Sequence, residues 1–305
     1  MKIVSLLPSA TELVYELGLG DSLSGVTFEC DHPADARTKP VISDTALPGE
    51  PPLGPNEIDT LVREHMDRRQ PLYVLDKERI AQIQPDVILT QDLCRVCAVP
   101  SGQVEDALEE LGCRSNVVSM DPQGLDDILD SFLDVGRVTG TESRARDLVD
   151  SLRDRIDAVR KAAAGLPAIR TLCTEWFDPP FVGGHWIPEM VGIAGGQNLL
   201  NQPRQRSRTA TWREIADAAP EVIVHMPCGY YLEDAEEEAL RLHDVPELRE
   251  TPARSRGAIF ATDASSYFSR PGPRIVDGLE ILAWAIHPDH FREPPRGAIA
   301  RVAGG

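Results

Sequence analysis

The sequence lacks any stretch that is long enough and apolar enough to cross a membrane. A membrane-spanning helix needs about 20 consecutive apolar residues. The N-terminal run Ile3–Leu7 ends at Pro8, and Glu12 and Glu16 follow it. No small-residue cleavage site of the kind that ends a signal peptide follows this run. We therefore expect a protein of the cytoplasm with no export signal and no membrane insertion.

Positive charge is also scarce. The chain has 31 lysine and arginine residues against 49 aspartate and glutamate residues, which gives a formal net charge of −18. Nucleic-acid binding needs a concentrated basic surface to neutralise phosphates, and an anionic membrane surface repels a chain of the same sign. The composition therefore argues against nucleic acid and lipid headgroups as partners and leaves a small-molecule ligand.

Several motifs of familiar enzymes are missing. The sequence has no Gly-x-Ser-x-Gly nucleophile elbow, no Gly-x-Gly-x-x-Gly fingerprint and no phosphate-binding loop. Only 5% of the residues are aromatic. Nothing therefore points to a classical nucleophilic hydrolase or to a dinucleotide-binding enzyme.

Two similar segments stand out among the features that are present. Pro85–Cys97 and Pro220–Cys228 each consist of a proline, an acidic residue, a short apolar run and a loop with cysteine. Each run reads as a buried strand, and each follows a short amphipathic helix, Lys77–Gln84 or Trp212–Ala219. Open α/β sheets bind ligands beyond the carboxyl ends of their strands. We therefore predict two similar lobes whose strand-end loops face each other across the ligand site.

The order of the predicted elements indicates an α/β fold with parallel sheets. Apolar strand candidates alternate with helical segments, as in doubly wound folds, and the proline-rich stretch Pro40–Pro55 is predicted to be a loop. Thr141–Ala164 has apolar residues at spacings of three and four, which predicts an amphipathic helix about 36 Å long. We expect an N-terminal lobe at residues 1–138, a linking helix at 139–165 and a C-terminal lobe at 166–305.

Six cysteines in a chain without an export signal suggest thiols or metal ligands rather than disulfides. Cys113 and Cys173 fall in a helix end and a strand, and read as small buried groups. The other four each follow a predicted strand end: Cys30, Cys94, Cys97 and Cys228. Their convergence would give a Cys₄ site for zinc or an iron–sulfur cluster. Four reduced loop thiols are the alternative.

Aromatic residues and one histidine gather in loops of the second half. Trp176, Phe177, His185 and Trp186 lie close together in the sequence, and Tyr267 and Phe268 follow a later strand. Such clusters pack the loops themselves or bind a flat, partly apolar ligand. Arg270 lies two residues after Phe268 and could hold an anionic group of a ligand or pair with neighbouring carboxylates.

The segment Ile3–Glu12, the Pro-Asp-Val-Ile-Leu strand at 85–89 and the Thr139-Gly140 entry to the long helix together resemble a known family. They are similar to the helical-backbone class of ABC-transporter substrate-binding proteins, and most of all to its cobalamin-binding branch. The cysteine loops and the segment 176–186 resemble a cytoplasmic subgroup of that branch. The resemblance implies two Rossmann-like lobes joined by one long rigid helix, with the ligand between them.

The ligand that the resemblance implies is a corrinoid, haem or a ferric siderophore. We expect a cobalamin-like or related metal chelate to contact the following residues: Ser9, Ala10, Trp176, His185, Trp186, Tyr267, Phe268 and Arg270. Without an export signal, a transporter partner is doubtful. The alternative function is a cytoplasmic metalloprotein or enzyme with the Cys-ligated site, and with His185 or Glu175 as acid or base.

Overall fold

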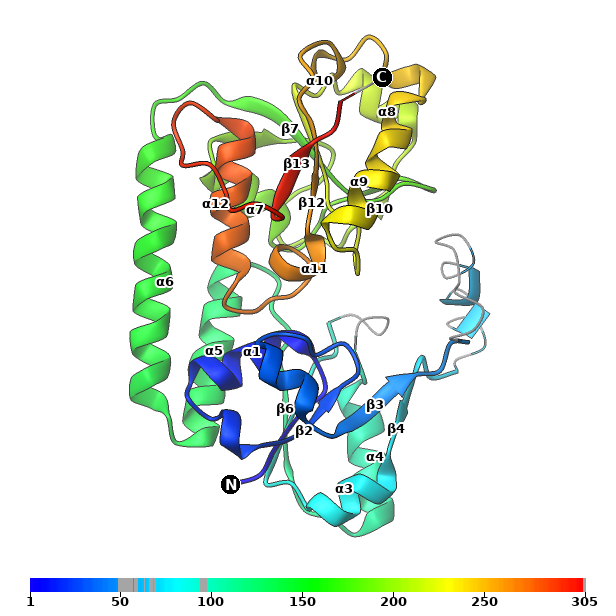
Figure 1. Cartoon of the computed structure of the whole chain (residues 1–305), viewed down its shortest axis with the longest axis vertical. Helices are drawn as coiled ribbons and strands as arrows, with labels where there is room; N and C mark the ends of the chain where they lie inside the picture. Colours follow the sequence, from blue (N-terminus) through cyan, green and yellow to red (C-terminus); the bar gives the residue numbers. More distant parts are fainter. Residues whose placement is uncertain are drawn as a thin grey trace. The chain divides into compact units, whose positions relative to one another are not determined.

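The computed structural model describes residues 1–48, 57, 60–62, 64, 65, 68, 70–93 and 98–303 of the chain. The chain divides into two compact units (Figure 1). Unit 1 is Met1–Pro122 with Leu129–Val149, and unit 2 is Gln123–Ile128 with Asp150–Gly305. Two helices cross this boundary, α5 at Leu125–Thr139 and α6 at Glu142–Ala163. Each unit is described by itself below.

Unit 1 contains a mixed sheet with the strand order β4-β3-β2-β1-β5-β6. Its strands are β1 Ile3–Ser5, β2 Leu23–Thr27, β3 Val41–Thr45, β4 Tyr73–Leu75, β5 Val87–Thr90 and β6 Asn116–Ser119. All neighbours are parallel except β3 and β4. Every residue of β1 and β5 is buried, as expected for parallel strands that are covered on both faces.

Helices of unit 1 cover this sheet through apolar side chains. Those with described bounds include α1 Pro8–Glu16, α3 Lys77–Ile83 and α4 Ser101–Leu111, with short 3₁₀ turns at Gly20–Ser22 and Ala34–Thr38. Ile80 of α3 and Val104 of α4 pack with Val4, Ile42 and Ile88 of the strands in one core cluster. Pro8 at the start of α1 suits a helix N-terminus, where its missing N–H is not needed.

Unit 2 contains a larger mixed sheet with the order β10-β8-β7-β11-β12-β13, and β9 pairs with the start of β7. Its strands are β7 Ile169–Trp176, β8 Phe181–Val182, β9 Gly196–Asn198, β10 Arg208–Thr209, β11 Val222–His225, β12 Ile259–Thr262 and β13 Ile299–Arg301. The central strands β7, β11 and β12 are parallel. The strands β8, β10 and β13 are antiparallel to their neighbours.

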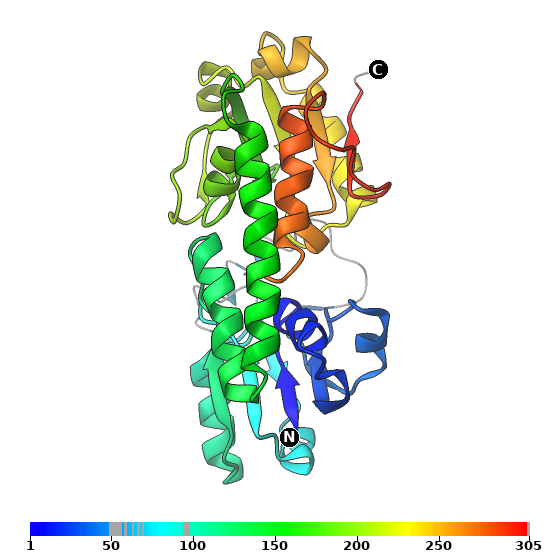
Figure 2. The same cartoon turned by 90° about the vertical axis from the view of Figure 1, so that its left-hand side faces the viewer.

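Helices lie on both faces of the unit 2 sheet, with α7 and α12 on one side of the strands and α8 and α9 on the other (Figure 1). The helices are α7 Ile187–Ile193, α8 Trp212–Asp217, α9 Leu232–Leu240, α10 Pro252–Ser255, α11 Ala264–Tyr267 and α12 Ile275–Ile286, with 3₁₀ turns at Arg241–His243 and Pro246–Leu248. The part of α6 in this unit lies beside α12 (Figure 2), where Arg155 pairs with Asp277 and Glu280.

The structure confirms the α/β fold and the repeated unit that the sequence predicts. Both proline-acid segments form fully buried strands, β5 and β11, and the predicted long helix is α6. Gly140, with a φ of 71°, separates α6 from α5. The prediction of loop for Pro40–Pro55 is wrong at Val41–Thr45, which forms β3 because β2 and β4 supply backbone partners on both sides. Both sheets also have antiparallel strands beside the predicted parallel ones.

In the described ranges no helix is both long enough and apolar enough to span a membrane. The predicted lobe boundaries at residues 1–138, 139–165 and 166–305 stay a prediction.

Candidate functional site

The candidate site in unit 2 lies where the parallel strands β7, β11 and β12 end. The strands are in register, with Thr174 beside His225 and His225 beside Ala261, so their carboxyl ends reach the same edge of the sheet. This is where open α/β sheets bind ligands. The strand ends and the segments that follow them carry most of the aromatic residues that the sequence singled out. We call this part of the molecule the aromatic edge: Glu175, Trp176, His185, Trp186, Tyr230, Tyr267 and Phe268.

Trp186 and Phe268 hold two loops of the aromatic edge together. Their exposed fractions are only 6% and 3%. The indole Nε1–H of Trp186 donates to the carbonyl oxygen of Phe268 at 3.0 Å. A buried tryptophan usually finds such a partner for its N–H. The contact joins residues 82 positions apart in the sequence and fixes the loop before α7 to the end of α11.

Trp176 and Tyr230 form a second aromatic contact, with ring centroids 5.7 Å apart in an edge-to-face arrangement. The backbone of Tyr230 also accepts a hydrogen bond from the N–H of Ser265 at 3.0 Å. Burial, and then the carboxylates of Glu238 and Asp234, raise the pKa of Tyr230 to about 12. Tyr230 therefore remains a neutral phenol, and the loop after β11 presents an uncharged ring.

Buried polar groups lie at the end of β11 in unit 2. The Nδ1 atom of His225 lies 2.8 Å from the hydroxyl of Thr174, and its Nε2 atom lies 2.9 Å from a carboxylate oxygen of Glu238. All three residues are buried. Buried polar groups need hydrogen-bond partners to offset lost hydration, and these contacts provide them. The triad fixes α9 against β7 and β11.

Glu175 carries the carboxylate of the aromatic edge. Burial raises its pKa above the ordinary value, whereas hydrogen bonds from the Ser207 side chain and the Gly184 N–H act in the opposite direction. The Gly184 nitrogen lies 3.2 Å from Oε1. Desolvation disfavours the charged form of any carboxyl group. The two donors therefore hold the side chain in place while burial favours its protonated form.

His185 has an unusual backbone conformation with a φ of 51°. Its N–H donates to Gln205 at 2.6 Å, and its carbonyl accepts from the N–H of Arg204 at 2.9 Å, which fixes this left-handed conformation. Burial, and then the positive charge of Arg206, lower the pKa of the imidazole. Its Nδ1 atom is buried without a hydrogen-bond partner among the described residues. A neutral imidazole is the form that binds metal ions.

The remaining predicted ligand contacts of unit 2 are Tyr267, the last residue of α11, and Arg270, which follows that helix. The ring of Tyr267 lies 5.7 Å from the guanidinium of Arg274. Arg270 is partly buried, and its carbonyl accepts from the N–H of Gly272 at 2.8 Å in a tight turn. The structure thus brings His185, Trp186 and Phe268 into one group, whereas Trp176 contacts Tyr230 instead.

Ser9 and Ala10, the predicted ligand contacts of unit 1, lie in the first turn of α1. Both are buried, with exposed fractions of 1% and 0%. This turn lies beside the loop that follows β2, where the hydroxyl of Thr11 is 3.0 Å from the sulfur of Cys30. Their role as ligand contacts stays a prediction.

The described residues give no support to the predicted Cys₄ metal site. Cys94 and Cys97 lie outside the described residues. Cys30 is buried in unit 1, and Cys228 is exposed in unit 2. The described part of the chain holds no group of three or more His, Cys, Asp or Glu side chains that could bind a metal. Cys173 is buried as expected, and burial raises the pKa of its thiol.

Sequence reasoning missed Ser207 and Arg206, which act on Glu175 and His185. Both lie in the segment 202–208, which has no known motif. The available signal was three arginines within five residues of a strongly acidic chain, at Arg204, Arg206 and Arg208.

Comparison with known proteins identifies the family. The model of the periplasmic binding protein family matches residues 3–265. The chain belongs to this family. An uncharacterized ABC transporter substrate-binding lipoprotein of Bacillus subtilis strain 168, YvrC, is 22% identical over 298 residues, which is 96% of this chain and 82% of the relative.

A curated relative and a solved structure of similar fold are each named after a ligand. The vitamin B12-binding protein of Yersinia pestis strain Pestoides F is 25% identical over 226 residues, which is 73% of this chain and 68% of the relative. The crystal structure of a periplasmic heme binding protein from Pseudomonas aeruginosa has a TM-score of 0.73 and 20% identity, and the match covers 99% of both chains. At that identity the structural likeness shows the fold alone.

Proposed function

We propose that the protein binds a corrinoid or a related metal chelate, with the aromatic edge of unit 2 as one part of the binding site. The observation that carries this proposal is the Trp186–Phe268 contact at the carboxyl ends of the parallel strands. It fixes the loop before α7 to the end of α11, which carries Tyr267, before any ligand arrives. Preorganised aromatic surfaces suit ligands with flat apolar faces.

The ligands named for relatives have the matching chemistry. Vitamin B12 and haem are each a large macrocycle around a metal ion, and one or the other is named for the Yersinia pestis and Pseudomonas aeruginosa proteins. Rings such as Trp176 and Tyr267 can cover the face of a macrocycle, and Arg270 can pair with polar groups at its rim. The neutral His185 can approach the metal. Ser9 and Ala10 stay the predicted contacts from unit 1.

Titration of the purified chain with cyanocobalamin, cobinamide and haem tests the proposal by calorimetry and absorption. We expect saturable binding of at least one of them at a ratio of one to one. Trp176→Ala should weaken that binding about fivefold or more, since loss of an aromatic side chain that stacks on a planar ring costs roughly 1 to 3 kcal/mol.

Trp284→Ala is the matched control. Trp284 lies on α12, and its ring makes an edge-to-face contact with Phe260 at 5.9 Å, close to the 5.7 Å between Trp176 and Tyr230. Both tryptophans are partly buried. If the two variants weaken binding equally, the aromatic edge is not the site. If the folded protein binds none of the three compounds, the ligand class is wrong.

The location of the protein in the cell is a separate proposal. The Bacillus subtilis relative is named as a transporter lipoprotein, whereas the sequence of this chain led us to expect the cytoplasm and a doubtful transporter partner. We keep the cytoplasmic location as a proposal. Fractionation of cells that express the chain tests it, and recovery in a periplasmic or membrane fraction would contradict it.

A further inference from the structure

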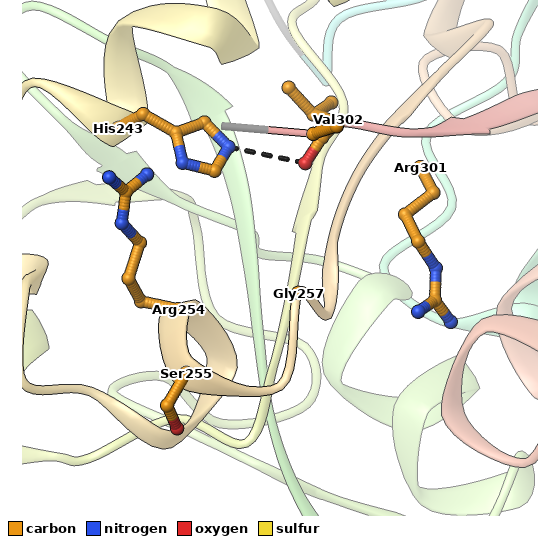
Figure 3. Close-up of a pocket in the computed structure, with 7 residues that line it drawn as sticks. His243, Arg254, Ser255, Gly257, Arg301 and Val302 are labelled. Carbon is orange, nitrogen blue, oxygen red and sulfur yellow. Dashed lines mark hydrogen bonds between the residues drawn. The ribbon is translucent and has the colours of Figure 1, made fainter. Parts of the chain in front are cut away.

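A cavity of about 430 Å³ lies in unit 2 near the amino end of β12, the opposite end from the aromatic edge. Its lining comes from three places: the 3₁₀ turn Arg241–His243, the segment between α10 and β12, and the chain that follows β13. The lining residues of interest are His243, Arg254, Ser255, Arg301 and Val302 (Figure 3). None of them belongs to the site described above.

The charge of this cavity differs from that of the whole chain. Two arginines and one histidine line it, and no carboxylate is found among its described lining residues. The chain as a whole carries a net charge of −18. The guanidinium of Arg301 lies 5.1 Å from the ring centroid of Phe260 and points away from His243 and Arg254 (Figure 3), so Arg254 supplies the fixed positive charge beside His243. The acidic chain thus contains a local positive potential.

Arg254 and His243 each have a buried nitrogen without a partner. Nη1 of Arg254 and Nδ1 of His243 make no hydrogen bond to any described residue. Figure 3 shows the Arg254 side chain pointing toward the His243 ring. Buried polar atoms without a partner are rare in native proteins and call for an explanation, of which a bound ion is one. Here two such atoms line the same cavity.

The hydrogen-bonding roles of the two nitrogens follow from chemistry. Nε2 of His243 lies 3.2 Å from the carbonyl oxygen of Val302. A carbonyl only accepts, so Nε2 carries the proton and Nδ1 of the neutral ring is an acceptor. The guanidinium of Arg254 only donates. The pair therefore offers one charged donor and one acceptor.

We propose that this cavity binds a phosphate group that carries a proton, either inorganic hydrogen phosphate or the hydrogen form of a phosphate monoester. A charged phosphate oxygen accepts from Arg254, and the P–OH group donates to Nδ1 of His243. Arginine is well suited to phosphate because its planar group donates several hydrogen bonds. A fully ionised anion such as sulfate can satisfy Arg254 but has no proton for His243.

Calorimetric titration of the full chain with inorganic phosphate, glycerol 3-phosphate and sulfate tests the proposal. We expect saturable one-to-one binding of at least one of the two phosphates, and sulfate at least about tenfold weaker, because only phosphate satisfies both nitrogens. The stronger of the two phosphates identifies the source of the group. In the folded wild-type protein, equal binding of phosphate and sulfate, or no saturable binding, would overturn the proposal.

Two variants and one control locate the site. Arg254→Gln should weaken phosphate binding at least about tenfold, and His243→Gln should remove the preference for phosphate over sulfate. Arg249→Gln makes the same change of charge at an exposed position outside the cavity lining and should leave binding unchanged. Equal weakening by the Arg254 and Arg249 variants would mean unspecific attraction and would refute the site. The selectivity of the wild-type protein tests the proposal even if a variant does not fold.

Discussion

The side chains at the two ends of the parallel strands in unit 2 differ in charge. At the carboxyl end, burial raises the pKa of Glu175 and Tyr230 and lowers the pKa of His185, so each shift favours an uncharged side chain. At the amino end, the cavity is lined by Arg254 and Arg301. Arginine keeps its charge in proteins. Nη1 of Arg254 is buried there without a partner among the described residues, so its charge calls for an anion, whereas the groups at the carboxyl end can lose their charge by gaining or releasing a proton.

The same ends also differ in how well their polar groups are satisfied. At the aromatic edge the indole N–H of Trp186 and the carboxylate of Glu175 have protein partners. At the amino end Nη1 of Arg254 has none among the described residues. Apart from Nδ1 of His185, which also has no partner among the described residues, the polar groups named at the first end are held by contacts within the protein, whereas the unpartnered atom at the second end belongs to a permanently charged group. Substitutions at the two ends should therefore affect stability very differently.

The largest expected effect is on stability at the aromatic edge. Trp186→Ala should lower the free energy of unfolding by about 3 to 5 kcal/mol, because it removes a large buried ring and leaves the carbonyl of Phe268 unpaired. Trp186→Phe keeps most of the apolar volume and should lose only about 1 to 3 kcal/mol. Urea denaturation of both variants measures the difference.

Arg254→Gln provides the comparison in buffer without phosphate. No hydrogen bond of its Nη1 atom to a described residue is lost, so the change in the free energy of unfolding should stay within about 0.5 kcal/mol, as for substitutions that remove no structural contact. A loss as large as that of Trp186→Ala would show that Arg254 stabilises the fold, and the contrast between the two ends would be wrong.

The local pattern of the sequence was enough to predict the repeated strands. Val87–Thr90 and Val222–His225 are short apolar runs bounded by proline and a loop, and both are buried strands. Val41–Thr45 was missed because its stability as a strand depends on β2 and β4, which lie elsewhere in the sequence. Periodicity within one segment contains no information about such distant partners.

The candidate site was predictable only in part. The clustering of aromatic residues pointed to the loops of unit 2, but not to the contact between Trp186 and Phe268, 82 positions apart. The Cys₄ prediction depended on convergence of distant loops, and the described cysteines, Cys30 and Cys228, give it no support. His243 and Arg254 belong to no motif, and only the fold places both at one cavity.

The next effect in size concerns the pH dependence of stability through Glu175. Its pKa in the folded protein lies above the ordinary value, chiefly because of burial. A carboxyl group of this kind contributes stability that is present below its unfolded pKa of about 4.3 and lost as the pH rises through the folded pKa. Glu175→Gln removes this loss. The stability of Glu175→Gln relative to wild type should therefore increase from pH 4 toward pH 7, as urea denaturation at each pH would show.

Glu214→Gln serves as the control because the pKa of Glu214 is lowered in the folded protein, whereas that of Glu175 is raised. The backbone N–H of Thr211 is the largest of the causes that lower the pKa of Glu214, so its contribution is present above the unfolded pKa and lost as the pH falls. Glutamine also fits the capping box that Glu214 forms with Thr211. Relative to wild type, Glu214→Gln should lose stability as the pH rises. Equal slopes for the two variants would contradict the environment assigned to Glu175.

The smallest expected effect concerns the positive charge beside His185. Burial is the larger cause of the lowered pKa of His185, and the charge of Arg206 is the second. Arg206→Gln should therefore raise this pKa, yet leave it below the ordinary value because the ring stays buried. Stability linked to His185 is present above its unfolded pKa of about 6.5 and lost as the pH falls, so the variant should lose less of it under acid conditions. NMR titration of the imidazole measures the shift.

Arg213→Gln is the control. The guanidinium of Arg213 pairs with Asp217 on α8, so this variant removes the same charge and should leave the pKa of His185 unchanged. If neither variant moves this pKa, burial alone keeps His185 neutral. In that case Arg206 would have no effect on its neighbour His185, whereas Arg254 at the cavity would still attract an anion. The two ends of unit 2 would then differ more than we infer.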